Sequence, residues 1–100
     1  MFDDDGFLID IGLWHEGLAA EIAWGEDIVL DAAHWEIIHA IRAYYQAFGL
    51  SPAMRPFTKY LKQALGADKA SSIYLLKLFP ESPAKLAAKI AGLPKPDNCL

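Results

Sequence analysis

The chain has 100 residues, of which 54% are hydrophobic and 22% charged, and these proportions predict one globular domain spanning residues 1–100. Its formal charge of −4 argues against a protein whose main task is to bind a nucleic-acid backbone, although an acidic average leaves room for a local basic patch. No apolar run approaches the length of a membrane span, and the acidic N-terminus is unlike a signal peptide, so we expect a cytoplasmic protein without membrane contact.

The N-terminal region predicts a small β element followed by a helix. Residues 3–6 have the composition of a turn, and the residues after them predict a short strand or hairpin arm over 7–11. Only six residues precede that strand, so we expect little β structure. Apolar residues at i, i+4 and i+8 then predict a helix over residues 13–24, with Gly25 as its stop.

The longest predicted helix covers residues 32–48, with Asp31 as its N-cap and Gly49 at its end. A broad apolar stripe on this helix is expected to face the core. The stripe consists of Ile37, Ile38, Ile41, Tyr44, Tyr45 and Phe48. The polar residues Glu36, His39, Arg42 and Gln46 are expected to face away from it.

A third helix is predicted after two prolines. Ser51-Pro52 resembles an N-cap followed by proline at the first helical position, but Pro56 would then lack an amide hydrogen that the fifth helical residue needs. We therefore expect a tight turn over 51–55 and a regular helix over 56–65. The basic face of this helix consists of Arg55, Lys59 and Lys62. A solvated surface is the usual role of such a face, and partner docking is the alternative.

Two further helices complete the prediction. Asp68 is expected to cap a helix over 69–79 that is buried on nearly all sides. Ser82 and Pro83 are expected to begin a last helix over 83–91, which Gly92 ends. The predicted fold class is therefore α+β and mostly α, with about five helices packed against a small N-terminal β hairpin or meander.

The last eight residues, 93–100, predict a mobile C-terminal arm. Pro94 and Pro96 restrict the backbone to extended conformations, so a free arm would reach about 25 Å from its anchor. It carries Cys99, the only cysteine of the chain. The alternative is a frayed terminus on which the cysteine is incidental.

Other reactive sites are not indicated by the pattern of residues. His15, His34 and His39 lack the spacing of a zinc site, so we expect no metal and interpret them as structural or surface residues. No phosphate-binding loop, nucleophile elbow or paired-carboxylate signature is present. A protease nucleophile requires a thiol held rigidly beside a histidine, which a penultimate residue on an arm does not provide. Cys99 therefore remains as the candidate nucleophile.

Nearby charges bear on the reactivity of the Cys99 thiol, because the thiolate is the nucleophilic form. Lys95, Lys85 and Lys89 would favour the thiolate, whereas Asp97 would oppose it. The sequence leaves the balance open.

At this point the motifs resemble those of a known family. They are Asp5-Gly6-Phe7-Leu8, His34-Trp35-Glu36 with Arg42 and Tyr44-Tyr45, Ser51-Pro52-Ala53 with Arg55 and Lys59, Tyr74-Leu75 with Leu78-Phe79-Pro80, Pro83-Ala84-Lys85, and Lys89-Ile90-Ala91-Gly92-Leu93-Pro94-Lys95-Pro96 with Cys99. They run in family order over nearly the whole chain, which resembles the DsrC/TusE sulfur-carrier family, also called the dissimilatory sulfite reductase gamma-subunit family.

The resemblance implies a three-stranded meander packed on helices, with a mobile C-terminal arm. It also implies that the penultimate cysteine, here Cys99, carries sulfur as a persulfide without a metal or organic cofactor. The protein would then be a carrier with sulfurtransferase-type chemistry more than a stand-alone enzyme.

One departure from the family pattern favours a branch of it. Dissimilatory members carry a second cysteine eleven positions before the last, where this chain has Ala88. The single cysteine is similar to the TusE-like branch, which relays sulfur from the TusBCD complex to the tRNA 2-thiouridylase MnmA for wobble-uridine 2-thiolation. This implies contact with tRNA only through protein partners.

Two alternatives stay open on the sequence alone. The first is a DsrC-like carrier in sulfur oxidation or sulfite reduction. The second is a non-catalytic regulatory or docking protein of the same fold, which uses the basic face that contains Arg55 and Lys59 and for which Cys99 is incidental.

Overall fold

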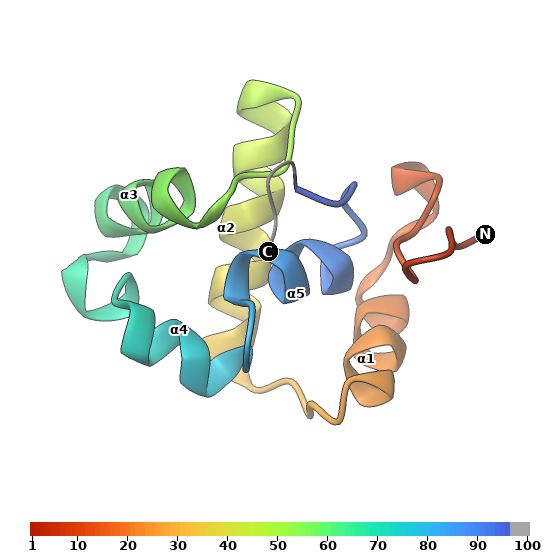
Figure 1. Cartoon of the computed structure of the whole chain (residues 1–100), viewed down its shortest axis with the longest axis horizontal. Coiled ribbons are helices and arrows are strands. Elements are labelled where there is room, and N and C mark those ends of the chain that lie inside the picture. Colours follow the sequence, from red (N-terminus) through yellow and green to blue (C-terminus); the bar gives the residue numbers. More distant parts are fainter. Residues whose placement is uncertain (97–100) are drawn as a thin grey trace.

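The computed structural model describes residues 1–96, and in this part of the chain it shows five α-helices and two short 3-10 helices. The α-helices are α1 (Glu16–Gly25), α2 (Ala32–Phe48), α3 (Met54–Leu65), α4 (Ser72–Leu78) and α5 (Pro83–Ile90), and the 3-10 helices are η1 (Ile11–Leu13) and η2 (Ala67–Lys69). In Figure 1, α2 and α5 occupy the middle, with α1 on one side and α3 and α4 on the other. Helix α5 contacts α1, α2, α3 and α4, so the last helix is the centre of the fold. No helix within residues 1–96 combines the length and apolarity that crossing a membrane requires.

The structure confirms the predicted bounds of helix α2. The Asp31 carboxylate accepts hydrogen bonds from the backbone N–H groups of Ala33 and His34, and the His34 ring accepts in turn from the Asp31 N–H, forming a capping box. At the other end Gly49 adopts a left-handed conformation, with φ of 75°. The buried part of its apolar stripe is Ile37, Ile38 and Ile41.

The predicted N-terminal β hairpin is not confirmed, because residues 1–96 contain no strand. One isolated antiparallel bridge joins Phe2 to Leu8 around the predicted turn. The extended run then ends at Asp10, whose carboxylate accepts a hydrogen bond from the Gly12 N–H and caps η1. The chain therefore bends into a helical turn before a second ladder position can form.

Helices α1 and α3 begin at residues other than those predicted, as does α4. Helix α1 begins at Glu16, after η1, with the His15 ring accepting a hydrogen bond from the Leu18 N–H. Helix α3 begins at Met54, so Pro56 lies in the first turn, where backbone N–H groups have no partner within the helix. Pro56 is therefore compatible with a helix, and the predicted helix start at residue 56 is two residues too late.

Helix α4 is shorter and more exposed than predicted. Its N-cap is Ser71, whose hydroxyl accepts from the Tyr74 N–H, and the predicted cap Asp68 lies in η2. Leu75 is fully buried, but Ile73 is 71% exposed, so the prediction of nearly all-round burial is wrong. The physical reason is that α4 packs against α5 and η2 along one side only.

Candidate functional site

The C-terminal segment leaves α5 through a hydrogen-bonded turn that directs it back over the protein. The Leu93 N–H donates to the Ala88 carbonyl at 2.9 Å and the Gly92 N–H to the Lys89 carbonyl at 3.2 Å, which is a Schellman motif. Gly92 has a φ of 73°, the left-handed conformation that this motif requires. Leu93 is fully buried. We call residues 90–96 the root of the C-terminal arm.

Trp14 and Arg42 hold the first two carbonyls of the root. The Trp14 Nε1–H donates to the Ile90 carbonyl at 2.9 Å, and the Arg42 Nη1–H donates to the Ala91 carbonyl at 2.6 Å. The Arg42 guanidinium also lies over the Trp14 ring, with Cζ 3.9 Å from the ring centroid, a cation–π arrangement. Burial lowers the pKa of Arg42 from its ordinary value. The prediction that Arg42 faces away is therefore wrong.

The same tryptophan makes glycine obligatory at position 92. A Cβ atom on Gly92 would lie 2.8 Å from the Trp14 Cγ atom and closer still to Cδ1, well inside van der Waals contact. Glycine is needed at this position for two reasons, its positive φ and the close approach of the indole ring.

Two further contacts extend the root to Pro96. The Ser51 hydroxyl, which is nearly inaccessible to solvent, donates to the Pro94 carbonyl at 2.5 Å. The Lys95 ammonium lies 3.4 Å from an Asp5 carboxylate oxygen, and Pro96 is buried. Residues 93–96, which the sequence assigns to a mobile arm, thus lie against the protein, while the mobility of the arm as a whole stays a prediction.

Cys99 lies outside the described residues, but covalent geometry limits its distance from the root. It follows Pro96 by three residues. Three residues of extended chain span at most about 10 Å. Covalent geometry therefore keeps Cys99 within about 10 Å of Pro96, much closer than the end of a free arm of about 25 Å would be.

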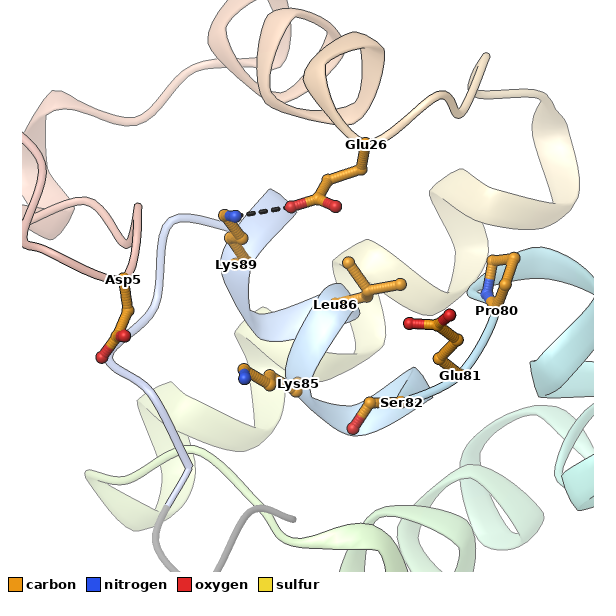
Figure 2. A pocket seen from close by; sticks show the side chains of 8 residues that line it. All are labelled: Asp5, Glu26, Pro80, Glu81, Ser82, Lys85, Leu86 and Lys89. Atoms are coloured by element: carbon orange, nitrogen blue, oxygen red, sulfur yellow. Dashed lines mark hydrogen bonds and ion pairs between the residues drawn. The ribbon is translucent and has the colours of Figure 1, made fainter.

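A pocket lies beside the root, and two of the predicted supporting lysines, Lys85 and Lys89, line it (Figure 2). The pocket has a volume of about 210 Å³ and lies between α5, the end of α1 and the N-terminal turn. Lys89 pairs with Glu26 at 2.5 Å, as Lys95 pairs with Asp5 on the rim. Within residues 1–96, Lys85 has no carboxylate at ion-pair distance. Of the three lysines, Lys85 is therefore the one whose charge is not already neutralised by a described carboxylate.

The remaining predicted supporting residues, Arg55 and Lys59, lie exposed on α3. In the described part of the chain no hydrogen bond or ion pair joins either of them to the root. The structure therefore shows no direct polar contact between these two residues and the root.

The histidines are not arranged as metal ligands in the described residues. His34 is buried, with one ring nitrogen 3.0 Å from the Leu78 carbonyl and the other in the α2 capping box. His39 is exposed and lies 3.3 Å from Glu16. Residues 1–96 contain no group of three or more His, Cys, Asp or Glu side chains that would hold a metal ion.

Local sequence patterns did not identify the residues that hold the root. Ser51 resembled a helix cap and Arg42 lay on the polar side of its helix, so each had an ordinary local interpretation. Only their occurrence within the family motifs, together with Gly92 after the last helix, signalled a further role.

Comparison with known proteins places these features in a family context. The family model described as "DsrC like protein" matches residues 1–100. Sulfurtransferase TusE of Sodalis glossinidius is 52% identical over 98 residues, covering 98% of this chain and 91% of that protein. The sulfurtransferase TusE homolog of Haemophilus influenzae is 51% identical over 98 residues, with coverage of 98% and 90%.

Solved structures agree with the sequence comparison. The NMR structure of Allochromatium vinosum DsrC superposes with a TM-score of 0.89 at 40% identity, covering 99% of this chain and 88% of that one. The crystal structure of the oxidized gamma-subunit of the dissimilatory sulfite reductase, DsrC, from Archaeoglobus fulgidus gives a TM-score of 0.81 at 39% identity, with coverage of 100% and 91%.

Proposed function

This chain belongs to the family of DsrC-like proteins, and on that premise we propose that it is a sulfur carrier that holds sulfur as a persulfide on Cys99. The observation that carries the proposal is that the only thiol of the chain follows, by three residues, a root held by Trp14, Arg42 and Ser51. The names of relatives about half identical to it, sulfurtransferase TusE, support sulfur transfer.

The chemistry proposed for Cys99 is displacement at sulfur. The thiolate attacks the outer sulfur of a donor persulfide, the donor's S–S bond breaks, and the donor leaves as a thiolate that takes up a proton. A new S–S bond makes Cys99 a persulfide, with no net oxidation or reduction. An acceptor thiolate then attacks the outer sulfur of Cys99 in the same way and releases the Cys99 thiolate.

Lys85 is the residue that we propose favours the thiolate. A nearby cation lowers a thiol's pKa, and Lys85 lacks a carboxylate partner within residues 1–96, whereas Lys89 and Lys95 have one each. If this is correct, Lys85→Met will shift the pH dependence of Cys99 alkylation upward by more than Lys95→Met does. Equal profiles for the two variants would remove Lys85 from the proposal.

We propose further that the sulfur is relayed toward 2-thiolation of the wobble uridine of tRNA. A TusBCD-like complex would be the donor and an MnmA-like tRNA 2-thiouridylase the acceptor, in the cytoplasm, with tRNA contacted only through the acceptor. Ala88 supports this branch over a role in sulfite reduction or sulfur oxidation. Its methyl group is fully buried in α5 at the place where dissimilatory members carry a second cysteine, so no pair of cysteines is present to form a disulfide.

Intact-mass measurement tests the carrier chemistry. The protein is incubated with a persulfide donor, and its mass is expected to increase by one sulfur atom in a form that a thiol reductant removes. Cys99→Ser is expected to gain none. Absence of the added sulfur, or equal addition to both proteins, would contradict the proposal, and full activity of Cys99→Ala in cells would favour a docking protein instead.

A further inference from the structure

An aromatic surface lies beside the root, where the sequence predicted core. Phe48 is 57% exposed and Leu50 is 52% exposed, so the apolar stripe of α2 leaves the core at its C-terminal end. The Tyr44 ring contacts the Phe48 ring at 4.5 Å and the Tyr60 ring of α3 at 5.2 Å between centroids. We call Tyr44, Phe48, Leu50 and Tyr60 the aromatic surface.

The aromatic surface borders the root directly. Leu50 precedes Ser51, the residue whose hydroxyl holds the Pro94 carbonyl. Figure 1 shows the blue end of the described chain, which the Ser51–Pro94 hydrogen bond joins to the α2–α3 connection, at the same end of the molecule. A protein that covers the aromatic surface would therefore lie within the short reach of Cys99.

Positive charge lies on α3, the helix that also carries Tyr60. Arg55, Lys59 and Lys62 are exposed, and no carboxylate pairs with them in the described part of the chain. Lys59 and Lys62 also line a shallow hollow of about 410 Å³ between α3 and the start of α4. We call these three residues the α3 cations.

The charge of the chain is divided along its length. All nine lysines and arginines lie at or after Arg42, whereas ten of the thirteen aspartates and glutamates precede it. Some of this charge is neutralised by ion pairs between the two parts, at Lys69–Glu36, Lys89–Glu26 and Lys95–Asp5. The α3 cations are left out of these pairs, so a chain with a net charge of −4 presents a local positive surface on α3, the helix that carries Tyr60.

We propose that the aromatic surface and the α3 cations together dock the protein that loads sulfur onto Cys99, and that this donor presents carboxylates around an apolar centre. The inference rests on the proposed function. Tyr and Arg are among the residue types that dominate binding energy in protein interfaces, Phe is enriched there, and complementary charge orients the partner. The acceptor is the poorer fit, because an enzyme that binds tRNA needs basic surface for its phosphates and would be repelled by the α3 cations.

RNA is the competing occupant of a surface that combines aromatic rings with cations. Binding to phosphates requires several cations, because affinity depends on the number of phosphates neutralised. Three cations on a chain with a net charge of −4 favour a protein with acidic groups.

The test compares one double variant with a matched control. Phe48→Ser with Lys59→Glu removes an exposed ring and reverses a cation on the proposed surface. Ile73→Ser with Lys77→Glu makes the same kinds of change at exposed positions of α4. Each protein is loaded either by a purified, persulfide-bearing TusBCD-type complex or by inorganic polysulfide, and Cys99 persulfide is followed by intact mass.

Loading by the protein donor is expected to be at least about 10-fold slower for the double variant, while loading by polysulfide stays within about twofold of wild type. The control variant is expected to match wild type with both donors. An unchanged rate of the double variant with the protein donor would overturn the docking site. Failure of wild type to accept sulfur from polysulfide would instead contradict the carrier function.

Direct binding separates docking from chemistry. The Cys99→Ser chain is expected to bind the donor complex, and its affinity is expected to fall about 10-fold when Phe48→Ser and Lys59→Glu are introduced into the same chain. The affinity is also expected to weaken as the salt concentration rises. The opposite result would be that wild type shifts tRNA in a gel, that the double variant does not, and that the donor affinity of the double variant is unchanged. This result would assign the surface to RNA and overturn the proposal.

Discussion

Gly92→Ala tests whether the root is held as the geometry indicates. Adoption of the left-handed conformation by alanine costs about 1–2 kcal/mol. The new methyl group would lie 2.8 Å from Trp14 Cγ and closer still to Cδ1, so the indole must move. This movement weakens its hydrogen bond to Ile90, for about 1 kcal/mol, and its contact with Arg42, for about 0.5–1 kcal/mol. The combined loss of about 3 kcal/mol corresponds to a melting temperature lower by about 12–24 °C in a domain of this size.

Gly49→Ala is the matched control for this prediction. Gly49 has nearly the same φ, 75°, but no atom lies within 4 Å of the position that an added Cβ would take, so alanine there incurs only the backbone cost of about 1–2 kcal/mol. Both variants are unfolded by heat and by urea. If Gly92→Ala is no more destabilised than Gly49→Ala, Trp14 does not confine the root and the reasoning is refuted.

Three further predictions concern the contacts of the root and of α2. Arg42→Met is expected to lower the free energy of unfolding, measured in urea, by about 2–3 kcal/mol, because the Ala91 carbonyl loses a charged donor and the Trp14 ring loses the cation above it. A loss below about 0.5 kcal/mol would contradict this. Ser51→Ala is expected to lower it by about 1 kcal/mol and to speed hydrogen exchange at the Leu93 amide, and unchanged exchange would show that the Pro94 contact does not hold the root. The hydrogen bond from the His34 N–H lowers the pKa of Asp31, so the stabilisation that the Asp31 carboxylate provides is complete above the ordinary value of 3.8 and disappears as pH falls through the lowered pKa. Asp31→Asn still caps the helix, and it is expected to lose less stability than wild type in that acid range, measured by urea midpoints. Parallel pH profiles of the two proteins would contradict this.

Helices α2 and α5 were predictable because their ends depend on neighbouring residues. Asp31 and Gly49 bound α2 because a capping carboxylate and a left-handed glycine act within one turn of the helix. Pro83 at the first position of α5 and Gly92 after it follow the same rule. These interactions span a few residues, so the order of amino acids is enough to specify them.

Some roles were missed because a residue's partner is distant in the chain. Ser51 has the chemistry of a helix cap, but its hydroxyl is used by Pro94, 43 positions away. Arg42 looked solvent-facing on its helix because no local pattern signals a carbonyl 49 positions away. Phe48 and Ile73 fit apolar stripes, yet the helices that would have covered them pack elsewhere.

The sequence by itself determined which thiol the proposed chemistry can use: the one at position 99, with no second cysteine at position 88 and with the family motifs around them. Only the tertiary structure decided where the arm leaves the protein. Its root is held by Trp14, Arg42 and Ser51, which are 76, 49 and 43 positions away from the carbonyls they bind. Contacts over such separations form only when α2 and α5 pack together, so they depend on the shape of the folded chain and not on any local pattern.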